Sequence, residues 1–147
     1  MLIARRYLIG AVLSSLAIGG ALALDYIGPA GNPAPLVVQF TRGTALAQGE
    51  AARVSAFVGE HVAEPSLRFH VLGHTGDRGD ADANLALSQD RAQAVADLLK
   101  EAGLDEAQLL SVQGIGSARP LAAGPEESDG ALQRRMARVV VTPVVRK

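Results

Sequence analysis

The sequence predicts one α/β domain, an α+β sandwich in which two main helices cover one face of a small mixed sheet, in the order β-α-β-α-β-β. Two observations predict this fold. Short runs of β-branched or alternating apolar residues are typical of strands, and two longer segments with apolar residues three or four positions apart are typical of helices. Because each main helix lies between two strands, both helices can pack against the same sheet.

The composition limits both the core and the partners. Of the 147 residues 48% are hydrophobic but only 3% are aromatic, so Ala, Val and Leu must build the core. The net charge is −1, which argues against a nucleic-acid partner because neutralising phosphates requires a basic excess. The sequence has no Cys, which excludes disulfides, thiol catalysis, Cys-ligated zinc and iron–sulfur clusters.

Residues 1–26 are predicted to be a signal peptide or an uncleaved transmembrane signal anchor. Arg5 and Arg6 precede the uncharged run 7–24. The sequence Ala-Leu-Ala near the end of this run favours cleavage, whereas the length of the run just reaches that of a membrane span. In both alternatives the basic end stays inside, so the rest of the chain faces the periplasm, and an uncleaved segment holds it to the inner membrane.

Residues 27–35, rich in Pro and Gly, are predicted to be a linker, and residues 36–147 the folded domain. The first half of the domain is predicted to form a strand over 36–40, a helix over 44–64 that Pro65 ends, and a strand over 67–71. The predicted inward face of this helix is Ala47, Ala51, Val54, Val58 and Val62.

The second half begins with a polar turn over 73–80 and a helix over 82–102, which Gly103 ends. The predicted inward residues of this helix are Leu87, Ala92, Val95, Leu98 and Leu99. The remaining predicted elements are a strand over 111–114, a loop over 116–130, a short helix over 131–136 and a last strand over 138–142.

The most specific pattern lies between the second strand and the second main helix. Gly73-His74-Thr75 is followed, without a gap in register, by Gly79, Asn84, Leu87-Ser88 and Arg91-Ala92. This pattern resembles the signature of the OmpA-like peptidoglycan-binding family, which is G-H-T-D, two residues, G, four residues, N, two residues, L-S, two residues, R-A. Segments 114–120 and 136–141 resemble later segments of the same family, so the resemblance covers about residues 36–142.

The resemblance implies a function that is not enzymatic: non-covalent binding of peptidoglycan in the periplasm, which links an envelope protein to the cell wall. In that family the signature Asp takes the ammonium, and the helix Arg the carboxylate, of a diaminopimelate in the stem peptide. A guanidinium suits the second role because its planar fork binds a carboxylate through two hydrogen bonds. The ligand-binding residues implied here are Thr75, Asp77, Asn84, Arg91 and Arg138.

The resemblance implies no cofactor and no metal. The histidines support this expectation, because His70 and His74 are four residues apart in extended chain, roughly 13 Å, and cannot share an ion. Peptidoglycan is the implied partner, together with possible proteins of an envelope complex.

The chain departs from the signature at its acid. The family has Asp where this chain has Gly76, and Asp77 follows. Either a positive φ at Gly76 lets the loop rotate Asp77 into the vacated place, or Arg91 acts alone and binding is weak. The second alternative is favoured because re-routing the loop requires a specific coincidence. A domain with such a degenerate site could instead be a structural or assembly subunit of an envelope complex.

Several residues of this region also have a purely structural interpretation, and Asp77 could be only a turn residue. Arg91 could be a solvated residue on the helix surface, and Asn84 could cap the helix or brace the loop. His74 is expected to brace the loop through hydrogen bonds. The arginines 134, 135 and 138 could form a solvated basic stripe.

Overall fold

The computed structural model describes residues 32–145. The predicted signal segment 1–26 lies outside the described residues, and of the predicted linker only residues 32–35 are described, without helix or strand. Within residues 32–145 no helix is both long and apolar enough to cross a membrane.

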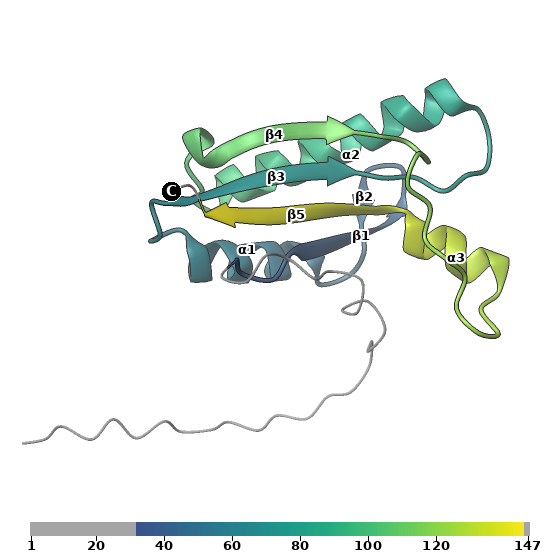
Figure 1. The fold of residues 1–147 in the computed structure, drawn as a ribbon, viewed down its shortest axis with the longest axis horizontal. Helices are drawn as coiled ribbons and strands as arrows, with labels where there is room; N and C mark the ends of the chain where they lie inside the picture. The colour runs from purple at the N-terminus through teal and green to yellow at the C-terminus, as the bar shows by residue number, and fades with distance from the viewer. Residues whose placement is uncertain (1–31, 146–147) are drawn as a thin grey trace, which may run out of the picture.

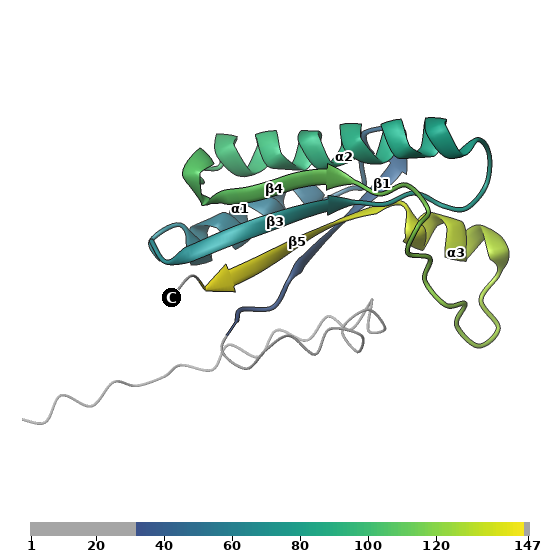
Figure 2. The ribbon, with the colours of Figure 1, turned by 45° about the horizontal axis from the view of Figure 1, so that its top comes forward.

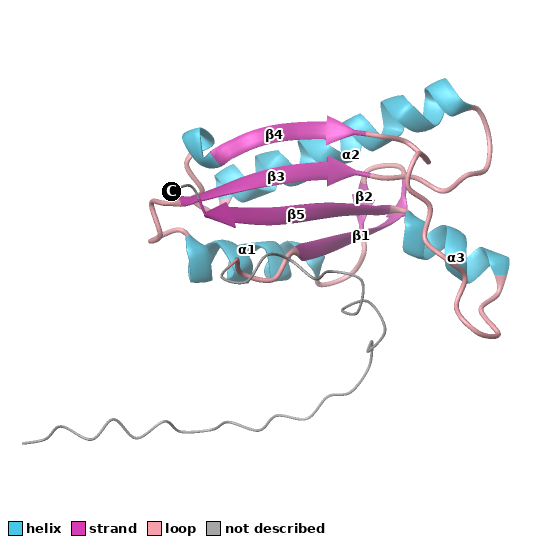
Figure 3. Ribbon diagram, viewed as in Figure 1, coloured by secondary structure: helices cyan, strands magenta, loops and turns pink. Residues whose placement is uncertain are grey.

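A five-stranded sheet forms the centre of the domain (Figures 1 and 3). Its strand order is β2-β1-β5-β3-β4, in which β3 and β4 are parallel and the other neighbours are antiparallel. The mixed sheet that the sequence predicts is confirmed. The strands are β1 (Leu36–Arg42), β2 (Ala45–Leu46), β3 (Leu67–Gly73), β4 (Leu109–Gly114) and β5 (Arg138–Val145).

Two helices cover one face of this sheet, as predicted (Figure 2). Helix α1 (Glu50–His61) packs on β1 and on α2 (Ala81–Glu101), which lies along β3 and β4. The third helix, α3 (Asp129–Met136), lies at the end of the sheet where β5 begins (Figure 1). Alternate strand residues fill the core beneath the helices, among them Val38, Phe69, Val71, Val139 and Val141.

The predicted start of the first helix at residue 44 is wrong. Ala45 and Leu46 pair with β1 as a short strand, and Gly49, with φ 84°, stands at the N-cap of α1. The predicted inward face also needs correction, because Ala51 and Val62 are exposed and Phe57 is buried. Phe57 packs edge-on against the ring of Phe69, with centroids 5.8 Å apart.

The other bounds differ from prediction by a few residues. Strand β4 begins at Leu109 rather than 111, after the 3-10 helix η1 (Glu106–Gln108), and β5 continues to Val145 rather than 142. Helix α3 begins at Asp129 because the Ser128 hydroxyl accepts a hydrogen bond from the Ala131 amide and caps it.

Candidate functional site

The candidate site lies at one end of the sheet, where β1, β3 and β4 end and β5 begins (Figure 1). The loop after β3 is fixed there by two backbone hydrogen bonds. The His74 amide donates to the Arg138 carbonyl at 2.8 Å, and the Thr75 amide donates to the Gly116 carbonyl at 3.0 Å. The loop therefore bridges the start of β5 and the segment after β4.

Two glycines let α2 approach this end closely. A Cβ on Gly73 would lie 2.0 Å from the carbonyl oxygen of Ser88, and one on Gly114 would lie 2.2 Å from the Gln89 amide nitrogen. The buried Ser88 hydroxyl accepts a hydrogen bond from the Gly116 amide at 2.8 Å. Three residues of the sequence pattern, Gly73, Gly114 and Ser88, therefore serve packing.

Arg91 of α2 is buried at this end of the sheet, with 5% of its surface exposed. Its Nε donates to the Gly43 carbonyl at 2.7 Å and its Nη1 to the His74 carbonyl at 3.2 Å. The guanidinium also lies 5.2 Å from the ring centroid of Phe40. The interpretation of Arg91 as a solvated surface residue is wrong, because the β1–β2 turn and the loop after β3 cover it.

Arg138, the first residue of β5, is buried as well, with 8% exposed. Its Nη1 donates to the Met136 carbonyl at 3.4 Å. Burial lowers the pKa of both Arg91 and Arg138, and repulsion from Arg135 lowers that of Arg138 further. Among residues 32–145 no carboxylate forms an ion pair with either guanidinium, whereas Arg135 pairs with Glu127 at 2.7 Å. The alternative of a solvated stripe therefore does not describe Arg138.

His74 bonds to both of the buried arginines, Arg91 and Arg138, through its backbone. Burial first, and then the charges of Arg138 and Arg119, lower its pKa to about 4, so its imidazole is neutral at pH 7. Within the part of the chain that the structure describes, its Nδ1 has no hydrogen-bond partner. As predicted, His74 braces the loop, but through its backbone amide and carbonyl.

Three buried polar side-chain atoms at this end of the sheet lack a hydrogen-bond partner within residues 32–145. Among the described residues, the buried side-chain nitrogen or oxygen atoms without a partner are Gln39 Nε2, His74 Nδ1 and Thr75 Oγ1. Gln39 lies opposite Arg138 in the β1–β5 register. Since buried polar groups are normally hydrogen-bonded, these atoms indicate a place for water or a polar ligand. We call Gln39, His74, Thr75, Arg91 and Arg138 the polar cluster.

The two other predicted site residues are Asp77, on the loop after β3, and Asn84, in the first turn of α2. Asp77 is exposed, and its Oδ1 accepts a hydrogen bond from Gln133 Nε2 of α3 at 2.5 Å. Asn84 Nδ2 donates to the Arg78 carbonyl at 2.9 Å and braces the loop. The rotation considered for Asp77 required a positive φ at Gly76, and Gly76 has none. Asp77 contacts α3 rather than Arg91.

Sequence reasoning missed Gln39 and Gln133. Gln39 interrupts an otherwise apolar strand next to Phe40, and this was the one available indication of its role. Nothing local marks Gln133, because its contact with Asp77 spans 56 residues of sequence.

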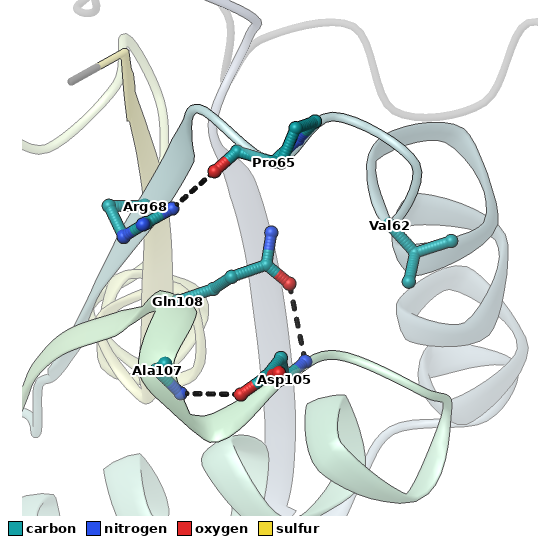
Figure 4. Close-up of a pocket in the computed structure, with 6 residues that line it drawn as sticks. All are labelled: Val62, Pro65, Arg68, Asp105, Ala107 and Gln108. Atoms are coloured by element: carbon teal, nitrogen blue, oxygen red, sulfur yellow. Dashed lines mark hydrogen bonds between the residues drawn. The ribbon is translucent and has the colours of Figure 1, made fainter. Parts of the chain in front are cut away.

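A surface hollow of about 260 Å³ lies at the opposite end of the sheet (Figure 4). Its polar side chains bond within the protein: Asp105 Oδ1 accepts from the Ala107 amide, Gln108 Oε1 accepts from the Asp105 amide, and Arg68 Nη1 donates to the Pro65 carbonyl. Within residues 32–145 no group of three or more His, Asp or Glu residues is arranged to hold a metal ion. The hollow is lined by Val62, Pro65, Arg68, Asp105, Ala107 and Gln108.

Comparison with known families decides the classification. The profile of the OmpA family matches residues 39–134, which span β1 to α3. The chain belongs to the OmpA family. The resemblance noted in the sequence is thereby confirmed, and so is the prediction that this protein is not an enzyme.

Curated relatives match a little less than half of this OmpA-family chain. The peptidoglycan-associated lipoprotein of Legionella pneumophila is 38% identical over 72 residues, 49% of this chain and 40% of the relative. The peptidoglycan-associated lipoprotein of Pseudomonas aeruginosa is 42% identical over 64 residues, 44% of this chain and 38% of the relative. The chain therefore spans less than half the length of these relatives.

Solved structures share the fold at lower identity. The peptidoglycan-associated lipoprotein from Burkholderia pseudomallei superposes with a TM-score of 0.64 at 24% identity, over 74% of this chain and 89% of the other. The periplasmic domain of Helicobacter pylori MotB gives a TM-score of 0.59 at 22% identity, over 74% of this chain and 71% of the other. These likenesses support the α/β fold of an OmpA-family domain.

Proposed function

We propose that this domain binds peptidoglycan non-covalently, through the diaminopimelate of its stem peptide, and links an envelope protein to the cell wall. Family membership supports peptidoglycan as the ligand. The buried guanidinium of Arg91 supports a carboxylate as the bound group, and Arg138, Thr75 and His74 belong to segments that meet at the same end of the sheet.

One observation carries the proposal: two guanidinium groups are buried without a carboxylate partner among residues 32–145. Burying an unpaired charge is costly, and backbone carbonyls compensate for only part of the lost hydration. A ligand carboxylate supplies the missing charge, and it also offers acceptors for the unpaired donors of the cluster.

A second function is favoured by the loop. Gly76 supplies no carboxylate, and Asp77 is bonded to α3. A domain with these features can serve as a structural or assembly subunit of an envelope complex without holding the ligand.

Sedimentation with purified sacculi tests both functions. The full chain, purified in a mild detergent, should sediment with sacculi, and free diaminopimelate should release it. A chain that stays in the supernatant would favour the assembly function.

We further propose that the domain faces the periplasm, on an inner-membrane anchor or after export. The basic start before residues 7–24 supports this orientation, and the relatives are described as lipoproteins or a periplasmic domain. A reporter that requires export, fused after Lys147, should be active. Sequencing of the mature N-terminus distinguishes the two forms, since a start at Leu24 means cleavage.

A further inference from the structure

The side-chain space of Gly76 is filled by a residue from α3. A Cβ built on Gly76 would lie 2.0 Å from Oε1 of Gln133 and 3.1 Å from its Cδ. Because Gly76 has no positive φ, the missing side chain provides space here rather than an unusual backbone conformation. The Gln133 carboxamide therefore stands where a side chain of residue 76 would stand.

The orientation of this carboxamide is fixed by Asp77. Because a carboxylate only accepts hydrogen bonds, the group facing Asp77 Oδ1 must be the Nε2 donor of Gln133. Oε1 therefore points toward Gly76, and among the described residues it accepts no hydrogen bond. The result is a free acceptor with the negative charge of Asp77 on its far side.

Two further contacts hold the loop and α3 in this arrangement. Arg78 forms an ion pair with Asp129 in the first turn of α3, and Asn84 Nδ2 bonds to the Arg78 carbonyl. Both contacts are made at Arg78, two residues after Gly76, and they join the loop to α3 and to α2. The hydrogen bond from Gln133 to Asp77 orients the acceptor before a ligand binds.

We propose that Oε1 of Gln133, oriented by Asp77, receives the ammonium of the ligand in place of a carboxylate on residue 76. The inference rests on the proposed function, because it assigns the second end of the same ligand. The places proposed for the two ends of the ligand are close along the chain. Arg91 bonds to the His74 carbonyl, and Gly76 follows His74 by two residues, at most about 7.6 Å of chain. An amide oxygen with a carboxylate behind it attracts an ammonium, although less strongly than a carboxylate in direct contact.

The test uses two probes that differ only at the amino group. One is a muropeptide whose single free amine belongs to diaminopimelate, and the other is the same muropeptide acetylated on that amine. Wild-type full chain in detergent should bind the free amine more tightly by about tenfold, as expected for one hydrogen bond to a charged group. Gln133→Ala should lose this preference and bind both probes alike.

Arg78→Ala is the matched control, because it removes the ion pair between the loop and Asp129 of α3 but leaves the Gln133 carboxamide in place. It should retain the preference for the free amine. Asp77→Ala should reduce the preference, and adding Gln133→Ala to it should cause little further loss, since both act through one carboxamide.

Each outcome decides the inference. An unchanged preference in Gln133→Ala, or tighter binding of both probes, would overturn it, and tighter binding would identify Gln133 as an obstruction. An equal loss in Arg78→Ala would also overturn it, because loop order alone would then explain the effect. Failure of the wild-type chain to bind either probe or sacculi would overturn the proposed function and this inference together.

Discussion

The two ends of the sheet differ in how their polar side chains are satisfied. Around the hollow near η1, Asp105 and Gln108 cap each other's backbone amides, and Gln108 Nε2 also donates to the carbonyls of Glu64 and Leu67 at 3.4 Å. At the polar cluster, two guanidinium groups lack a carboxylate and three buried polar atoms lack any partner within residues 32–145. Within the described residues, this hollow and the unpaired polar groups therefore lie at opposite ends of the sheet.

The comparison indicates which property marks a binding site. The hollow offers volume, but its polar groups already have partners within the protein, so a ligand there would gain little. The polar cluster offers donors whose hydrogen bonds are still to be made. We therefore expect substitutions at the cluster to change binding and substitutions at the hollow to change only stability.

The largest effect is expected from Arg91→Ala. Loss of a charge-assisted pair should weaken sacculus binding by about 10- to 150-fold, roughly 1.5–3 kcal/mol. The melting temperature should also fall, because the bonds to Gly43 and His74 and the contact with Phe40 disappear. Arg91→Lys should recover part of the binding, since an ammonium keeps the charge but loses the fork.

Leu104→Ala is the control for the stability component of that effect. Leu104 is as buried as Arg91, with 4% exposed, but lies after α2 near the opposite end of the sheet. It should destabilise the fold by about 2–5 kcal/mol without changing the affinity of the folded fraction. Unchanged sacculus binding by Arg91→Ala would remove Arg91 from the site.

The second prediction concerns the stability of the domain at acidic pH, to which His74 of the polar cluster should contribute. The pKa of His74 is about 4 in the folded state and 6.5 as its ordinary value, so the unfolded state binds more protons between these pH values. The contribution of His74 to the free energy of unfolding is therefore fully present above pH 6.5 and is lost as the pH falls toward 4. From pH 7 to pH 5 the contribution of His74 should fall by about 2 kcal/mol.

Urea unfolding at the two pH values measures this loss. His74→Gln should flatten the pH dependence, whatever its effect on stability at pH 7. A variant with the same pH dependence as the wild type would show that His74 is not the group that titrates.

A third prediction concerns the carboxylate that residue 76 lacks, which a substitution can add. Gly76→Asp places a carboxylate where the Gln133 carboxamide now stands, and that flexible side-chain end can move aside. Binding of a stem peptide with a free amine should strengthen about tenfold, because a carboxylate in direct contact attracts an ammonium more than an amide oxygen does. Calorimetry with the muropeptide measures the gain. Weaker binding would mean that the displaced Gln133 disrupts the loop.

The fold could be predicted from the sequence because the spacing of the apolar residues distinguishes strands from helices. Alternation placed Phe69 and Val71 in the core, and helical spacing placed Val95 and Leu99 there. The two-residue strand β2 escaped prediction because Ala45 and Leu46 are too few to show a period.

The site was predicted less completely, for a physical reason. The family signature implied Arg91 and Thr75 as candidate residues, but signature residues do not reveal their neighbours in space. The burial of Arg91 depends on Gly43, 48 residues earlier, and the partner of Asp77 lies 56 residues later. Contacts of this range are decided by the sheet order, which local patterns do not show.

The smallest effect is expected at the hollow, from Asp105→Ala. Asp105 Oδ1 accepts from the Ala107 amide at 2.8 Å, and its own amide donates to Gln108 Oε1 at 3.2 Å. The substitution removes the first bond and keeps the second, because alanine retains the amide. Loss of an N-cap acceptor should lower stability by about 0.5–1 kcal/mol, measured by urea unfolding.

Sacculus binding by Asp105→Ala should equal that of the wild type. The hollow is separated from the polar cluster by the length of β3 and β4, and the cap touches none of the cluster residues. A mild destabilisation of this size leaves nearly all of a stable domain folded, so binding reports on the site alone. If binding instead fell severalfold at an unchanged folded fraction, the hollow would contribute to recognition, and the division between the two ends of the sheet would be wrong.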